Sequence, residues 1–128
     1  MTEIVRIDLP EVLAIHAHQL DEHGGAAGLR DLDLLESALA RARQRNAYDD
    51  PDVFDLAAAY TAAIIGNHPF VDGNKRTGFV VGLLFLELNG PTFLASEADA
   101  TRAVLDLAAG EIKMDELASW LRANSTSL

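Results

Sequence analysis

Cysteine is absent from this chain of 128 residues, so it can form neither disulfide bonds nor thiolate metal sites. Cations are also scarce: 10 lysines and arginines stand against 20 aspartates and glutamates, a formal net charge of −10. Nucleic acids and anionic membranes bind cationic surfaces, so this charge argues against DNA or a membrane as a main partner. A protein partner with a basic surface fits it better.

Long apolar runs are missing as well. The longest, "FVVGLLFLELNG" (residues 79–90), is too short to cross a bilayer and contains Glu87 and Asn89. The first residues, "MTEIVRIDLPEV", lack the basic segment and apolar core of an export signal. We therefore expect a soluble, cytoplasmic protein.

The sequence does contain regular helix signals. With 49% hydrophobic residues, the chain is long enough for one domain, residues 1–128, with its own core. Apolar residues recur at helical spacing, and the pattern predicts an all-α fold without repeats. Six helix starts are marked by capping or apolar residues: a capping box of Asp8 and Glu11, Asp31 or Asp33, Asp50-Pro51, Asn74, Ser96 with Asp99, and a last helix around Leu117 and Leu121.

Two details of this fold can be predicted from the pattern. The fourth helix, residues 74–89, is apolar on nearly every side, which indicates a central helix surrounded by the others. "GPTFLAS" (residues 90–96) is the candidate for a short extended piece.

The segment "HPFVDGNKRTG" (residues 68–78) gathers reactive residues where the fourth helix begins. A helix N-terminus leaves about four N–H groups unpaired and carries partial positive charge, so it suits phosphate. Gly73 lets backbone amides approach an anion closely. Asn74, Lys75 and Arg76 add hydrogen-bond donors and positive charge.

Two other residues of the segment suit chemistry at a bound phosphate. Asp72 would repel phosphate unless a cation lies between them, and Mg²⁺ is the simplest one, since it takes one carboxylate and leaves room for phosphate oxygens and water. Imidazole groups titrate near neutral pH, so His68 can accept a proton from a hydroxyl that attacks phosphorus. Base, metal ligand and anion cradle together indicate phosphoryl or nucleotidyl transfer.

A structural interpretation exists beside each functional one. Gly73 alone is most often a turn residue, and His68 before a proline is often part of a plain loop. Lys75 and Arg76 can simply be solvated, but at a helix start they oppose the dipole unless an anion faces them, which favours function. Phe70 is interpreted as an anchor that holds the loop to the core.

Three residues receive structural roles only. His16, on the apolar face of the first helix, is interpreted as a satisfied core or rim histidine rather than a ligand. Gly78 and Gly82, four residues apart, are interpreted as a surface on which another helix packs closely.

The stretch "HPFVDGNKR" resembles the signature of the Fic/Doc superfamily, His-x-Phe-x-Asp/Glu-Gly-Asn-Gly-Arg-x-x-Arg. "GGAAGLRDLDLLESALARA", "LFLELNG" and "GEIKMDELASWLRANS" extend the likeness to the short Doc (death-on-curing) branch. The resemblance implies a single-domain helical bundle whose central buried helix is opened by the motif loop. By motif position, it also implies His68 as general base, Asp72 as Mg²⁺ ligand, Gly73, Asn74, Lys75 and Arg76 as the ATP phosphate site, and Phe70 as the buried anchor.

The activity implied by the resemblance depends on the branch. Doc toxins belong to toxin–antitoxin modules; they phosphorylate a threonine of elongation factor Tu and halt translation, whereas typical Fic proteins transfer AMP from ATP. Here Lys75 replaces the glycine after Asn74, as in the Doc variant, and Phe79 replaces the second arginine. A Doc-like kinase toxin using ATP and Mg²⁺ is therefore the leading hypothesis. AMP transfer to a protein hydroxyl and a non-catalytic phosphate-binding or interaction module are the alternatives.

The resemblance also bears on partners. Fic proteins that inhibit themselves carry a Ser/Thr-x-x-x-Glu-Gly/Asn helix whose glutamate pairs with the second arginine, and neither part is present here. We therefore expect an antitoxin protein to cover the site in trans. The glycine-rich residues 24–30 lie where the family's target-docking flap is expected, although a plain loop between helices explains them as well.

Overall fold

The structure is a computed structural model in which residues 4–48 and 50–126 are described. These ranges contain α1 (Leu9–His23), α2 (Leu32–Tyr48), α3 (Val53–Asn67), α4 (Asn74–Asn89), α5 (Glu97–Ala108) and α6 (Met114–Ala123). Extended pairing within them is limited to two isolated bridges, Leu29 with Phe70 and Phe93 with Ser125. The predicted all-α class is confirmed. No helix of the described residues is long and apolar enough to span a membrane.

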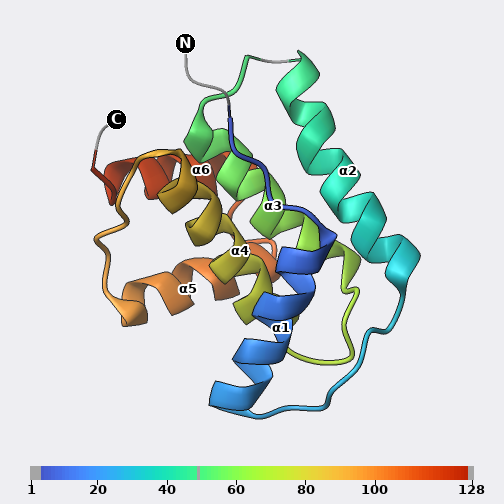
Figure 1. Ribbon diagram of the computed structural model, residues 1–128. Coiled ribbons are helices and arrows are strands. Elements are labelled where there is room, and N and C mark those ends of the chain that lie inside the picture. Colours follow the sequence, from blue (N-terminus) through green and yellow to red (C-terminus); the bar gives the residue numbers. More distant parts are fainter. Residues whose placement is uncertain (1–3, 49, 127–128) are drawn as a thin grey trace.

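Helices α3 and α4 form the centre of the bundle (Figure 1). α2 and α6 pack on α3, α1 packs on α4, and α5 contacts both central helices. Ten of the fifteen residues of α3 are buried, but only seven of the sixteen residues of α4, mainly on one face. The expected central helix is thus one of a pair. Alanines at 57, 58, 59 and 63 let neighbours approach α3 closely, which explains why it is the more buried of the two.

The two central helices cross antiparallel at a surface of small residues. A Cβ atom at Gly82 would overlap Thr61 Oγ1 and lie 3.1 Å from the carbonyl oxygen of Ala57. At Gly78 it would lie 3.1 Å from the carbonyl oxygen of Thr61. Thr61 Oγ1 instead donates a hydrogen bond of 2.7 Å to Gly78 O, across the helix interface. The packing interpretation of both glycines is confirmed.

The helix starts agree with the capping residues in part. Ser96 accepts the N–H of Asp99 (3.1 Å), as predicted for α5. Asp31, the first of two candidates, caps α2. The capping box predicted for α1 is wrong: Asp8 occupies the N-cap but makes no side-chain cap bond, because its carboxylate pairs with Arg43 of α2. Tertiary contact thus overrides the local signal.

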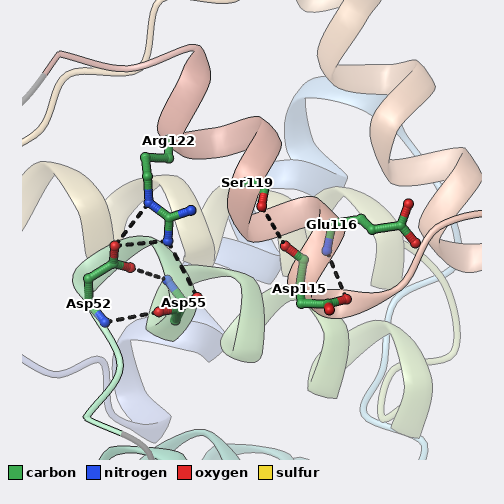
Figure 2. Close-up of polar contacts among 6 residues, drawn as sticks. All are labelled: Asp52, Asp55, Asp115, Glu116, Ser119 and Arg122. Carbon is green, nitrogen blue, oxygen red and sulfur yellow. Dashed lines mark hydrogen bonds and ion pairs between the residues drawn. The ribbon is translucent and has the colours of Figure 1, made fainter.

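Helix α3 begins later than the predicted Asp50-Pro51. Asp52 is its N-cap and forms a capping box with Asp55: Asp52 Oδ1 accepts the Asp55 N–H (2.9 Å), and Asp55 Oδ2 accepts the Asp52 N–H (3.0 Å). Arg122 of α6 reaches both carboxylates, at 2.8 Å from Asp52 and 3.5 Å from Asp55 (Figure 2). Helix α3 therefore begins where the same two aspartates both cap the helix and form ion pairs with Arg122.

The same network makes part of the stability depend on pH. Burial raises the pKa of the Asp52 carboxyl, but the hydrogen bond from the Asp55 backbone and the Arg122 guanidinium outweigh burial, and the pKa is lowered from 3.8. A carboxyl with a lowered pKa in the folded state stabilises the fold above its unfolded-state pKa. This contribution is lost as the pH falls through the lowered pKa of Asp52.

Helix α6 and the residues after it are held by local hydrogen bonds and by pairing with residues 90–96. In the first turn of α6, Asp115 accepts the Glu116 N–H (3.0 Å), and Ser119 Oγ donates to the Asp115 carbonyl (3.1 Å; Figure 2). The predicted extended piece pairs with the segment after α6: the Leu94 N–H donates to Asn124 O at 2.8 Å.

Two glycine-to-alanine variants test the helix crossing. Gly82→Ala should lower the free energy of unfolding by about 1–3 kcal/mol, because the new methyl group has no room. Gly66→Ala should raise it by about 0.5–1 kcal/mol, since Gly66 lies within α3 with no atom within 4 Å of a new Cβ atom. Urea unfolding monitored by circular dichroism measures both. Equal effects of the two variants would contradict a close crossing at Gly82.

Candidate functional site

The loop between α3 and α4 carries the motif residues. α3 ends at Asn67, and Pro69, two residues later, disfavours a further helical turn. His68 is its C-cap, in a left-handed conformation with φ 54° and ψ 52°, and its N–H donates to Ile64 O (3.1 Å). Its side chain is exposed. The imidazole is therefore not part of the core and is accessible from solvent.

A cavity of about 820 Å³ opens above this loop, between α4 and α5. Six predicted site residues line it together: His68, Asp72, Gly73, Asn74, Lys75 and Arg76. The rest of the wall is mixed: α4 and α5 supply apolar residues such as Leu83 and Val104, and α1 supplies the polar residues Gln19, Glu22 and His23. The fold thus joins a polar end, formed by the motif, to an apolar trough between two helices.

The polar end contains the N-terminus of α4. Its first intrahelical bond runs from the Thr77 N–H to Gly73 O (3.0 Å), so the N–H groups of residues 74–76 precede the ladder. No side chain caps this end, and Gly73 is left-handed with φ 82°. Lys75 and Arg76 are exposed there and take part in none of the ion pairs among the described residues. An anion at this point would meet the dipole, free amides and two cations.

Asn74 lies differently from the prediction. Its side chain is buried, with 4% of its surface exposed. Its Oδ1 accepts the Phe70 N–H (2.9 Å) and its Nδ2 donates to Phe70 O (3.0 Å), so the amide holds the loop closed. The side-chain oxygen and one of the two amide hydrogens of Asn74 are thus used within the loop, and its contact with a bound anion stays a prediction. Phe70 itself is fully buried, as an anchor of the loop would be.

Asp72 is exposed at the edge of the cavity. Its Oδ1 accepts the Gly73 N–H (2.8 Å), and its Oδ2 accepts the Ala26 N–H (3.3 Å). Among the described residues, no three His, Asp or Glu side chains gather into a metal cluster. One carboxylate beside an anion site is a donor set that fits Mg²⁺ shared with phosphate oxygens and water, and does not fit zinc.

Comparison with known proteins shows the family of this chain. Residues 6–86 match the sequence profile of the Fic/DOC family. The chain belongs to the Fic/DOC family. It is 35% identical over 113 residues to a protein named "Protein kinase doc" from Escherichia phage P1, covering 88% of this chain and 89% of that protein. It is 36% identical over 105 residues to "Toxin Doc" of Mycolicibacterium smegmatis, covering 77% and 78% of the two chains.

The part that matches the Fic/DOC family includes the glycine-rich segment before α2, which contacts the motif loop directly. Residues 28–31 pair with the loop backbone: the Val71 N–H donates to Gly28 O (3.1 Å), and the Arg30 N–H donates to Pro69 O (2.7 Å). The Arg30 side chain donates from Nε to His68 O (2.7 Å). Sequence reasoning missed Arg30, because a lone arginine before a capping aspartate carries no distinctive signal.

Phe79, which stands at the second arginine of the Fic signature, has a packing role. It is half-buried and meets Phe93 edge to face, with ring centroids 5.8 Å apart and planes at 77°. Phe93 in turn lies 5.4 Å from the Trp120 ring. In this member of the Fic/DOC family, that position therefore joins α4 to Phe93 and, through Phe93, to Trp120 of α6, and it places no cation in the cavity.

Asn74→Ala tests how the loop is held. Removal of the amide leaves the buried N–H and carbonyl of Phe70 without partners, which should cost about 2–4 kcal/mol of unfolding free energy. The neighbouring Lys75→Ala is the matched control, because Lys75 is exposed and should change stability by less than about 0.5 kcal/mol. Chemical denaturation measures both. An Asn74→Ala variant as stable as Lys75→Ala would show that the amide does not hold the loop.

Proposed function

We propose that this protein is a Doc-like toxin that transfers the γ-phosphate of ATP to a serine or threonine hydroxyl of a target protein, elongation factor Tu by resemblance, and so halts translation. The observation that carries the proposal is the uncapped start of α4, which faces a cavity together with the exposed His68 and Asp72. The printed names of the relatives, a protein kinase and a toxin, support it.

The start of α4 would bind the γ-phosphate. Backbone N–H groups of residues 74–76 and the side chains of Lys75 and Arg76 supply donors and positive charge on one side of the cavity. Asp72 would hold Mg²⁺, which supplies neutralisation of phosphate charge when bound. The binding energy then positions phosphorus near His68, which lines the same cavity.

His68 would act as general base. Its exposed imidazole accepts the proton of the target hydroxyl while the hydroxyl oxygen forms a bond to the γ-phosphorus. The bond between the γ-phosphorus and the bridging oxygen of ADP breaks at the same time. The products are a phosphorylated side chain, ADP, and a protonated His68 that returns its proton to solvent. Arg30 holds the His68 carbonyl, which limits movement of the base.

Two residues favour this route over AMP transfer. AMP transfer needs the α-phosphorus beside the base and a cation on the leaving pyrophosphate. Phe79 offers no cation and is held in an aromatic contact with Phe93. Lys75 adds a long side chain where the Fic signature has a glycine. Loss of such a cation commonly costs about 10²-fold or more in rate, so AMP transfer should be slow.

An antitoxin protein is the proposed regulator. The cavity continues from the motif into an apolar trough between α4 and α5, lined by Leu83 and Val104 among others. An amphipathic segment of another chain could cover this trough and the motif at once. With a net charge of −10, the toxin favours a partner segment with basic residues.

Parallel reactions with ATP labelled on the α- or γ-phosphate test the transfer, with purified elongation factor Tu and a bacterial extract as acceptors. We expect protein-bound label from γ-labelled ATP only. His68→Ala should lower the rate by about 10²–10⁴-fold without loss of stability, whereas His18→Ala, exposed on α1 and outside the cavity lining, should keep it. Label from the α-position would support AMP transfer, and no label from either would support the non-catalytic module.

Bacterial growth tests the toxin and its regulator. Expression of the wild-type chain alone should slow growth, and His68→Ala should abolish this effect at an equal level of soluble protein. Co-expression of the antitoxin should restore growth. Normal growth with an abundant, folded wild-type chain would contradict the toxin assignment.

A further inference from the structure

One buried histidine contacts the motif loop without belonging to the motif. His16 lies on α1, which packs beside α4 (Figure 1), and only 6% of its surface is exposed. Its ring is stacked on Phe70, with centroids 3.7 Å apart and planes at 8°. Its Nε2 lies 2.8 Å from the carbonyl oxygen of Asp72. A carbonyl oxygen only accepts, so Nε2 carries the hydrogen and donates it. The expectation of a satisfied histidine is confirmed.

This hydrogen bond determines the orientation of one peptide group. The Asp72 carbonyl and the Gly73 N–H belong to the same peptide, and no described peptide bond is cis. In a trans peptide the two groups point in opposite directions. Because His16 holds the oxygen toward α1, the Gly73 N–H points away from α1, where it meets Asp72 Oδ1 at 2.8 Å. Asp72 and Gly73 both line the cavity.

Without such a contact the peptide could adopt either orientation. Rotation of the group changes chiefly ψ of Asp72 and φ of Gly73. Gly73 has φ 82° and ψ 16°, and glycine tolerates positive and negative φ about equally. In the reversed orientation the carbonyl oxygen would face the cavity, and its partial negative charge would repel an anion at the start of α4.

We propose that His16 is a positioning residue: it holds the Asp72 carbonyl so that the Gly73 N–H faces the anion site. Stacking on Phe70 orients the ring, and the hydrogen bond selects one of two peptide orientations. A cation that drew the Asp72 carboxylate away from this N–H would leave the Gly73 N–H available to the anion. The inference rests on the proposed function in one respect: it takes phosphate as the anion that binds at the start of α4.

Two substitutions separate the hydrogen bond from packing. His16→Phe keeps a flat ring against Phe70 but loses the donor. His16→Gln loses the ring but keeps an N–H donor at a position similar to Nε2. A purely structural role predicts that His16→Phe equals or exceeds His16→Gln in every readout. The proposal predicts that His16→Phe matches or exceeds the glutamine variant in thermal stability and falls below it in anion binding.

Two measurements on the full chain follow the peptide, neither of which needs transfer activity. The first is the Gly73 amide signal in ¹⁵N–¹H spectra of the protein without added phosphate. We expect His16→Gln to keep the wild-type position and His16→Phe to show a shifted, broadened or doubled signal. The second is a titration with inorganic phosphate in the presence of Mg²⁺ at fixed ionic strength, in which His16→Phe should bind about tenfold or more weakly than wild type.

The outcomes distinguish the two proposals. An unchanged Gly73 signal and unchanged phosphate affinity in His16→Phe would overturn the role of His16. A Gly73 signal that changes in His16→Phe, in a protein whose wild-type form does not bind phosphate, would support His16 and contradict the proposed phosphate site. If His16→Phe does not fold, His16→Gln decides: loss of the wild-type Gly73 signal in that variant overturns the proposal.

Discussion

The close crossing of α3 and α4 is the contact on which the rest of the structure depends. Gly78 and Gly82 allow the two backbones to approach, and Thr61 donates across the interface to Gly78 O at 2.7 Å. The motif loop connects these same two helices. The distance between the two helices therefore determines how far the loop must reach. The close packing of α4 on α3 also determines that the start of α4 lines the cavity.

The loop itself is held by groups that do not react. Asn74 bonds both backbone groups of Phe70 from within, the 28–31 segment pairs with the outer side, and His16 holds the Asp72 carbonyl from α1. These contacts satisfy the backbone of a tight, partly buried turn. His68, Asp72, Lys75 and Arg76 keep exposed side chains as a result. Side chains that hold the loop are thus distinct from those that stay exposed, which suits a site that is rigid before a ligand binds.

The charge distribution adds to this picture. The protein carries a net charge of −10, yet the start of α4 places two adjacent cations beside an uncapped helix end. The cavity lining contains the carboxylates of Glu22, Asp72 and Glu97 as well as these two cations. On a protein with this net charge, two cations at one helix end favour a compact anion such as a nucleotide phosphate over a long polyanion. The Asp72 carboxylate would compete with such an anion, because it accepts the Gly73 N–H that the anion would use.

The sequence by itself determined the helical class, most helix boundaries and the motif residues at one end of the cavity, because these depend on local periodicity, capping chemistry and a contiguous motif. It could not determine contacts made across the fold. Asp8 turned to Arg43 instead of capping α1, Asn74 turned inward to Phe70, and Arg30 reached the His68 carbonyl. Only the tertiary structure decided these three contacts. Each partner lies on another element or on the inner side of a turn, and the local sequence pattern does not determine the path of the chain there. The same holds for His16: its spacing marks it as buried, but only the packing of α1 against the loop brings its Nε2 to the one carbonyl that orients Gly73.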